Sequence, residues 1–278
     1  MNVKWAIAII FSVVFVTRIA LADLPIQVRV DRWLEVRQVN GTVAFRPTNQ
    51  RASPAQVGNR LQRVGDAIST AARSGSILAV DTNIGFIDVS ENTLVRLQEL
   101  RTTSDGGKIT RLQIPQGQAR LRVRPFTNDS SELEIETPAG WSGVRGTEFG
   151  IAVQPDGKMG VATLDGSVIT RAQGETVDVD AGFQNLTIPG EPPSPPVPLE
   201  GRGDPSLRLR VLTTPDNETA TIIGQIDPVN LLIIEGLSQT VDPDGRFDVS
   251  VPLPPSRRIE AVVITPLSLR QAYELAVP

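Results

Sequence analysis

The stretch from Thr137 to Ile151, TPAGWSGVRGTEFGI, holds the residues whose types and spacing could do chemistry. A glycine-rich loop can hold a phosphate when it leads into a helix N-terminus, usually with a following Lys and Ser or Thr. The residues after Gly146 instead place apolar side chains at alternate positions, as a strand does. Gly143 and Gly146 also fit the G-x-x-G of an RNA-binding module, but that module is helical around its loop. We therefore expect these glycines to serve backbone geometry, where a strand bends or enters a sheet.

Three residues of this stretch, Trp141, Arg145 and Glu148, are the candidate contacts for a binding partner. Trp141 lies among glycines, where an aromatic ring can be exposed, although core packing or anchoring of the loop explains it equally well. Arg145 and Glu148 are the charged residues of the loop. For Arg145 we favour a buried, hydrogen-bonded structural role over contact with a partner.

The composition excludes much of the usual catalytic chemistry. The chain contains no histidine and no cysteine, which removes disulfides, zinc sites of the usual kind, the Ser-His-Asp triad and an imidazole general base. The 31 acidic residues could supply a carboxylate pair for glycoside hydrolysis, but the sequence singles out no pair. Aromatic residues make up only 4% of the chain, which is little for a sugar-binding platform of Trp or Tyr. We therefore predict a non-catalytic protein with no cofactor and no bound metal.

The first 22 residues have the features of a secretory signal peptide. Lys4 gives a positive start, Ala6–Val16 is a mainly apolar run, and Ala20–Ala22 offers the small residues that a signal peptidase recognises. Arg18 interrupts the run before it reaches the roughly 20 apolar residues of a membrane span, although a retained anchor remains the alternative. We expect cleavage after Ala22 and a periplasmic or secreted protein. The net charge of −4 argues against a general nucleic-acid binder, which needs a basic face.

A proline-rich segment divides the rest of the chain. Residues 189–205 hold seven prolines, which favour an extended conformation and are excluded from helices and central strands. We therefore predict a first domain over residues 23–188, a semi-rigid linker over 189–205 and a second domain over 206–278. Short stretches that alternate apolar and polar residues, separated by Gly, Pro, Asn and Asp, predict an all-β fold for both domains.

The expected strands of the first domain include Gly85–Val89, Arg111–Ile114, Gly160–Ile169 and Thr176–Val179. The segment Ser53–Ala72 is ambiguous. Its Ser-Pro start suits a helix, whereas the two glycines within it weaken that interpretation.

Two charged segments can be aligned as a hairpin. Arginines alternate with apolar residues in Ala119–Arg124, and glutamates do so in Glu132–Thr137. Antiparallel pairing would set every arginine opposite a glutamate, and each such pair contributes roughly 0.2–1 kcal/mol. A slip by one residue would bury the charges, so we predict that this register is strongly specified. A basic ligand-binding strand is the alternative, but the glutamates would neutralise it.

The second domain shows strand patterns at the spacing of a small β-sandwich: Ile222–Ile226, Leu231–Glu235, Arg246–Val251, Ile259–Thr265 and Tyr273–Val277. The residues from Asp242 to Phe247 predict a turn that leads into a strand, with Gly245 at the position that tolerates positive φ. Asp242, Asp244 and Asp248 could gather oxygens for calcium, but the EF-hand spacing is absent and we favour the turn. The stretch Ile233–Leu253 resembles immunoglobulin-like accessory modules of bacterial surface and carbohydrate-active proteins.

Thr137-Pro138 and Val144–Phe149 resemble the signature of the FecR domain, which runs roughly T-P-x-A/G … V-R-G-T-x-F. Further segments resemble the family's other landmarks in the same order: Val64–Thr70, Ser74–Val80, Val89–Thr93, Leu164–Val168 and Val179–Gly182. The resemblance covers about Gly41 to Ile188. It implies a β-rich, solenoid-like envelope domain that is used for protein contact rather than catalysis.

In the best-known members of that family, the domain carries a signal from an outer-membrane transporter to a cytoplasmic sigma factor. Those members place a helical anti-sigma domain before a transmembrane helix, and we find no counterpart of that pair in this sequence. We therefore predict a non-catalytic cell-envelope protein that recognises another protein or a polysaccharide. One alternative is a FecR-type component of envelope signalling that acts with a separate anti-sigma or transporter partner. A second alternative is an accessory part of a carbohydrate-active enzyme.

Overall fold

The computed structural model describes residues 32–81, 84–200, 203–214 and 218–277. Over these residues the chain is built from strands and contains no α-helix, which confirms the all-β prediction. The predicted signal peptide, residues 1–22, lies outside the described residues. In the part of the chain that the structure describes, no helix is long and apolar enough to cross a membrane.

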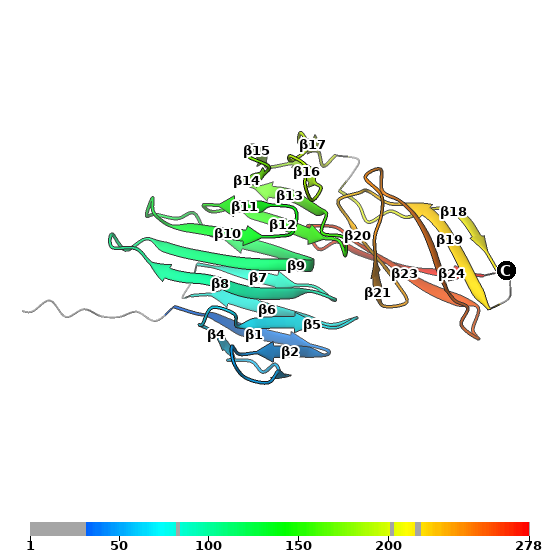
Figure 1. Cartoon of the computed structure of the whole chain (residues 1–278), viewed down its shortest axis with the longest axis horizontal. Helices are drawn as coiled ribbons and strands as arrows, with labels where there is room; N and C mark the ends of the chain where they lie inside the picture. The colour runs from blue at the N-terminus through cyan, green and yellow to red at the C-terminus, as the bar shows by residue number, and fades with distance from the viewer. Residues whose placement is uncertain (1–31, 82–83, 201–202, 215–217, 278) are drawn as a thin grey trace, which may run out of the picture. The chain divides into compact units, whose positions relative to one another are not determined.

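The strands are labelled as in Figure 1. The first seventeen are β1 (Leu34–Asn40), β2 (Val43–Arg46), β3 (Ser53–Pro54), β4 (Arg60–Leu61), β5 (Ala67–Thr70), β6 (Gly75–Val80), β7 (Gly85–Val89), β8 (Leu94–Thr102), β9 (Lys108–Val123), β10 (Glu132–Glu136), β11 (Trp141–Val144), β12 (Glu148–Val153), β13 (Met159–Asp165), β14 (Ser167–Ala172), β15 (Glu175–Asp180), β16 (Phe183–Thr187) and β17 (Val197–Pro198). The others are β18 (Arg208–Thr213), β19 (Thr219–Gln225), β20 (Leu231–Ile234), β21 (Leu237–Gln239), β22 (Arg246–Pro252), β23 (Arg258–Ile264) and β24 (Arg270–Ala276).

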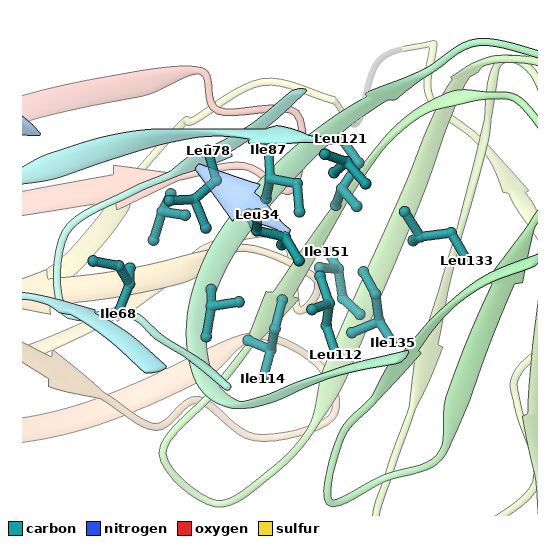
Figure 2. Packing of buried hydrophobic residues seen from close by; sticks show 14 of the residues in the cluster. Leu34, Ile68, Leu78, Ile87, Leu112, Ile114, Leu121, Leu133, Ile135 and Ile151 are labelled. Carbon is teal, nitrogen blue, oxygen red and sulfur yellow. The ribbon is translucent and has the colours of Figure 1, made fainter. Parts of the chain in front are cut away.

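The first seventeen strands form two layers that share one long strand. The first half of β9 pairs with β8 and β10, and its second half pairs with β7 and β12. The β10 layer has the order β3-β2-β5-β8-β9-β10-β11-β14-β15, and the β12 layer has the order β4-β1-β6-β7-β9-β12-β13-β16-β17. Apolar side chains from both layers meet in one buried cluster, which includes Leu34, Ile68, Leu112 and Ile135 (Figure 2). This alternation of inward apolar and outward polar residues is the pattern that predicted the strands.

Ser53–Ala72 forms no helix. It holds β3, β4 and β5 instead, and its Gly58 and Gly65 have φ of +92° and +93°. These values lie outside the helical region, so the two glycines mark turns. The predicted strand Gly160–Ile169 proves to be two strands, β13 and β14, separated by a turn at Gly166 with φ +78°.

The predicted hairpin of Ala119–Arg124 with Glu132–Thr137 is wrong. Both segments contain strands, but β10 pairs in parallel with the first half of β9, not with its second half. The arginines in the second half of β9 form ion pairs with Glu148 of β12 and Asp88 of β7. Opposite charges therefore do meet across strands, but the partners come from distant parts of the sequence. Alternation within a segment sets which face is charged, and it does not determine which strand lies beside it.

The residues after the proline-rich segment form two further sheets, β18-β19-β22 and β21-β20-β23-β24. Side chains of both sheets, such as Ile222 and Phe247 from one and Leu232 and Val263 from the other, form a second buried cluster. Each of the five strands predicted for this region is present. The immunoglobulin-like resemblance stays a prediction.

The predicted turn before β22 is also present. Gly245 has φ +79°, and its N–H donates to the carbonyl of Asp242 at 2.8 Å. The Asp242 carboxylate accepts hydrogen bonds from the backbone N–H groups of Asp244 (2.9 Å) and Arg246 (2.8 Å). This carboxylate therefore closes the turn, which agrees with the turn interpretation rather than with calcium binding.

Arg32–Pro278 form one compact unit, and within it the two-sheet region packs against the β12 layer. Ala152 of β12 forms a small buried cluster with Leu231, Ile233, Val262 and Ile264. The proline-rich segment contributes β17, which pairs with the start of β16 at the edge of the layer, where a strand tolerates proline. The domain boundaries at residues 188 and 206 stay predictions.

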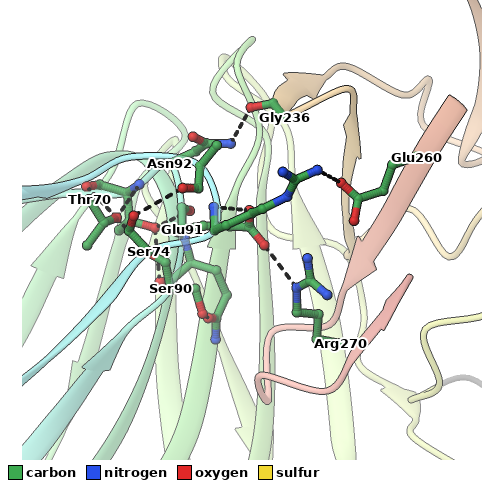
Figure 3. A network of polar contacts seen from close by, with 12 residues as sticks. Thr70, Ser74, Ser90, Glu91, Asn92, Gly236, Glu260 and Arg270 are labelled. Atoms are coloured by element: carbon green, nitrogen blue, oxygen red, sulfur yellow. Dashed lines mark hydrogen bonds and ion pairs between the residues drawn. The ribbon is translucent and has the colours of Figure 1, made fainter. Parts of the chain in front are cut away.

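Polar contacts surround this packing (Figure 3). The Glu91 side chain is only 5% exposed, and its carboxylate accepts hydrogen bonds from the Arg73 N–H (2.7 Å) and from Arg270 Nε (3.0 Å). Arg73 also forms an ion pair with Glu260. Asn92 Nδ2 donates to the carbonyl of Gly236 at 3.0 Å. Loops of the first seventeen strands are thus tied to β23 and to the β20–β21 turn.

One buried carboxylate makes a pH-dependent contribution to stability. Asp66 is 4% exposed and accepts three backbone N–H bonds, from Thr48 (2.7 Å), Gln62 (2.9 Å) and Arg63 (2.9 Å). Burial alone would raise the pKa of Asp66, but the backbone donors outweigh burial and hold this pKa below its ordinary value of 3.8. The ionised form is therefore favoured by folding.

We expect Asp66→Asn to lower the free energy of unfolding at neutral pH by about 1–3 kcal/mol, because the amide cannot accept from all three donors. Since the folded pKa is depressed, the stabilisation is present above the ordinary pKa of 3.8 and is lost as pH falls through the folded value. Urea unfolding of both proteins between pH 7 and pH 2 measures the difference. A difference that does not shrink at low pH would contradict this role for the carboxylate.

Candidate functional site

The glycine-rich segment begins with a tight turn, Thr137–Gly140, that leads from β10 into β11. The N–H of Thr137 donates to the Gly140 carbonyl (2.9 Å), and the Gly140 N–H donates back to the Thr137 carbonyl (3.3 Å). A Cβ atom on Gly140 would lie 2.4 Å from the carbonyl oxygen of Arg171 in β14. Glycine at this position therefore allows two strands to approach closely.

The segment next crosses from the β10 layer to the β12 layer at Gly146. Its φ is +132°, and a Cβ atom there would lie 2.3 Å from the Cα of Pro125. The carbonyls on either side, of Arg145 and Thr147, each accept a backbone hydrogen bond at 2.9 Å, from Phe126 and Val123. A strand, β12, starts at Glu148, so no helix N-terminus follows Gly146 and a phosphate cradle is not formed. Glycine here serves backbone geometry, as the sequence predicted.

We expect Gly146→Ala to lower the free energy of unfolding by about 2–3 kcal/mol, because it adds both backbone strain and a clash with Pro125. Gly106→Ala is the matched control, since Gly106 also has positive φ (+87°) but no atom within 4 Å. Chemical denaturation of both variants separates the clash from the strain. Equal losses for both would show that the contact with Pro125 has no effect.

The three candidate contacts lie in two places. Trp141 is 40% exposed at the start of β11, and Arg145 is exposed just after this strand ends at Val144. Arg145 donates a hydrogen bond to the carbonyl of Asp129, so it is hydrogen-bonded as expected but exposed rather than buried. Glu148 lies on the β12 layer and forms an ion pair with Arg120. The structure therefore brings Trp141 and Arg145 together and leaves Glu148 apart from them.

Trp141 and Arg145 border a surface hollow of about 770 Å³ on the β10 layer, which we call the Gly143 hollow. It lies over β10, β11, β14 and β15, and its other lining residues are Arg111, Asp129, Ser130, Ser131, Glu132, Glu134, Gly143, Val144, Ser167, Ile169, Arg171, Asp178 and Asp180. Ile169 is 43% exposed and supplies a second apolar contact beside Trp141. Three arginines face five carboxylates, so the lining carries a net negative charge.

Two of these carboxylates crowd one another. Glu132 and Glu134 are on the same face of β10, because side chains two residues apart in a strand point the same way. The pKa of the Glu132 carboxyl is raised, first because it shares a hydrogen bond with Glu134 and then because of burial and like charge. Glu134 also forms an ion pair with Arg111. A cation placed near Glu132 would relieve this crowding.

Sequence reasoning missed most of the hollow. Ile169, Asp178 and Asp180 come from β14 and β15, and only the pairing of β11 with β14 brings them beside Trp141. Their signal in the sequence was the alternation in each strand, which marks them as outward-facing. It could not say that their strands lie next to the glycine-rich segment.

Residues 66–169 match the family described as FecR protein. No protein with a curated description matches the chain. Two crystal structures of a proposed anti-sigma factor from Parabacteroides distasonis ATCC 8503 are similar, each with 16% sequence identity and a TM-score of 0.39. The similarity covers 48% of this chain and 59% of that chain. The matched family span contains the turn, the crossing at Gly146, β10, β11 and the first half of β14, and it ends before β15. This chain therefore carries a FecR domain over residues 66–169.

Proposed function

We propose that this protein is a component of envelope signalling, a FecR-type regulator that acts by contact with a separate anti-sigma or transporter protein. The observation that carries the proposal is the FecR match over residues 66–169, which favours signalling over general recognition of proteins or polysaccharides. The work of such a protein is regulatory rather than enzymatic. The signal-peptide features of the first 22 residues support a location in the periplasm or outside the cell.

The contact surface in this proposal is the Gly143 hollow, because it combines exposed apolar side chains with charged residues. Trp141 and Ile169 lie beside arginines and carboxylates on an otherwise solvated sheet face. Protein interfaces commonly place aromatic residues and arginine at their centre with a polar rim. The packing of the two-sheet region is on the other layer, so it leaves this face uncovered.

The test removes the gene from its native host and measures transcription across the genome. We expect a discrete set of genes under one sigma factor to change, and to recover when the gene is restored. In parallel, a photo-crosslinking amino acid at Ile169 should capture one protein partner. The same amino acid at Val57, which is 65% exposed and far from the hollow in the strand order, is the control. Unchanged transcription after the deletion would refute the signalling role.

A further inference from the structure

Gly143 differs from every other glycine that the structure describes. The others have a positive φ, or a neighbouring atom within 3.4 Å of the position where a Cβ would lie, or both. Gly143 has neither, since the nearest atom to its Cβ position is Glu134 Cγ at 4.0 Å. Neither a turn nor close packing therefore requires glycine here, although glycine in a strand interior weakens the strand.

The position of Gly143 in the sheet explains the effect of having no side chain there. In the register of the β10 layer, Gly143 lies between Glu134 on β10 and Ile169 on β14, and Asp178 on β15 follows Ile169. Trp141 is two residues away on the same face, opposite Arg171. A side chain at residue 143 would stand between these groups and fill the hollow. Glycine in a strand is also typical of a site where another chain or a ligand approaches the backbone closely.

The charges that line the Gly143 hollow indicate the chemistry of the segment that it binds. Glu132 and Glu134 lie on β10, next to β11, and Asp178 and Asp180 lie on β15, which is separated from β11 by β14. The lining as a whole is net negative. Arg111, the arginine beside Glu134, is already engaged in ion pairs with Glu99 and Glu134. An anionic polysaccharide or an acidic peptide would be repelled here, whereas lysine or arginine side chains would be attracted. The exposed ring of Trp141 adds a face on which a cation can rest.

We propose that the Gly143 hollow binds an extended, basic segment of a protein partner, which lies against the backbone at Gly143 with lysine or arginine side chains on the carboxylates and Trp141. This inference rests on the proposed function for the idea that the partner is a protein. To that function it adds that the recognised segment is basic, and that Gly143 leaves the space in which this segment lies.

The test is a titration of the isotopically labelled full chain with pentalysine amide at low ionic strength, followed by backbone amide NMR. We expect saturable shifts in β10, β11, β14 and β15, and binding about tenfold weaker in Gly143→Leu. Gly143→Leu keeps every charge, so it separates the hollow from general attraction of a cation to an acidic protein. Its unfolding midpoint should equal or exceed that of the wild type, because a leucine at an open strand position has no clash. Should that variant fail to fold, the pair Asp178→Asn and Asp180→Asn replaces it, since both side chains are exposed.

Several results would overturn the inference. Absence of saturable binding, shifts centred elsewhere, or equal affinity of wild type and Gly143→Leu would each do so. Binding of pentaglutamate or maltohexaose in place of pentalysine, lost in Gly143→Leu, would assign the hollow to an acidic peptide or a glycan. Because the titration uses purified protein, it can fail while the deletion still alters transcription. Conversely, pentalysine can bind as expected while the signalling role fails.

Discussion

Replacing Arg32 by methionine should lower the free energy of unfolding by about 3–5 kcal/mol, since it leaves the partner carboxylate buried and uncompensated. The Arg32 and Asp81 side chains are only 5% and 6% exposed, and their ion pair spans 2.8 Å. Arg32 also donates to the carbonyls of Arg101 and Ile109, each at 2.6 Å, and to Thr110 Oγ1 at 2.7 Å. One guanidinium thus joins the entry to β1 with the end of β8 and the start of β9.

The control for this prediction is Arg37→Met. The Arg37 side chain is 54% exposed and pairs with Glu35 at 3.1 Å, so its loss should cost less than about 1 kcal/mol. The double variant Arg32→Met with Asp81→Asn should recover part of the loss, because no buried charge then remains. Asparagine suits residue 81, whose φ is +46°. Guanidinium denaturation measures all four proteins. Similar losses for Arg32→Met and Arg37→Met would show that the buried network is not a major source of stability.

The strands could be predicted from the sequence to a large extent, and their partners could not. Alternation is a local property, so Gly85–Val89 and five of the seven strands of the C-terminal region were found where the structure has them. Pairing depends on which distant segments share a core. The parallel pairing of β10 with the first half of β9 requires the chain to return across the layer, and the charges of β9 match several acidic strands equally well. A complementary register was therefore necessary for the predicted hairpin but not sufficient.

The candidate site shows the same division. Trp141 and Arg145 are two residues of one short strand and its end, so their proximity followed from the sequence. Glu148 follows the crossing at Gly146, which moves it to the other layer. Gly140, Gly143 and Gly146 look alike in the sequence, yet their surroundings differ. Gly140 lies against a neighbouring strand, Gly143 borders an open hollow, and Gly146 lies where the chain crosses between the layers. The physical reason for Gly140 and Gly146 is a neighbour that is distant in sequence, whereas Gly143 has an open position, and only the structure distinguishes these cases.

The outward-facing residues of β12 are small, and the fold shows that this is because the C-terminal region packs against them. Phe149 and Ile151 point into the buried cluster, and the outward positions between and after them are Gly150 and Ala152. Small residues on the outer face of a central strand allow another element to approach closely. Ala152 contacts the C-terminal sheet, and Gly160 of β13 faces Val229 in the same way. The outer face of β12 and β13 therefore carries a closely packed contact with the C-terminal sheets within one unit.

Gly150→Val should therefore be among the most damaging single substitutions in this chain, with a loss of about 3 kcal/mol or more. A Cβ atom on Gly150 would lie 1.7 Å from the carbonyl oxygen of Pro266, which is backbone and cannot rotate away. Gln118 Nε2 also donates a hydrogen bond of 2.5 Å to this carbonyl oxygen. A movement of Pro266 that relieved the clash would therefore break this hydrogen bond as well. Denaturant unfolding should then show the C-terminal sheets separating from the β12 layer in a transition of their own, at a lower concentration than in the wild type.

Gly143→Val is the matched control for this substitution. Both glycines lie in strands, but Gly143 is open where Gly150 is covered, so valine at residue 143 should leave stability unchanged or raise it slightly. If the contact with the C-terminal region is maintained in solution, only Gly150→Val lowers the unfolding midpoint. If the two regions separate freely, valine at either position has the same small effect, because the carbonyl of Pro266 is then absent from the surroundings of Gly150.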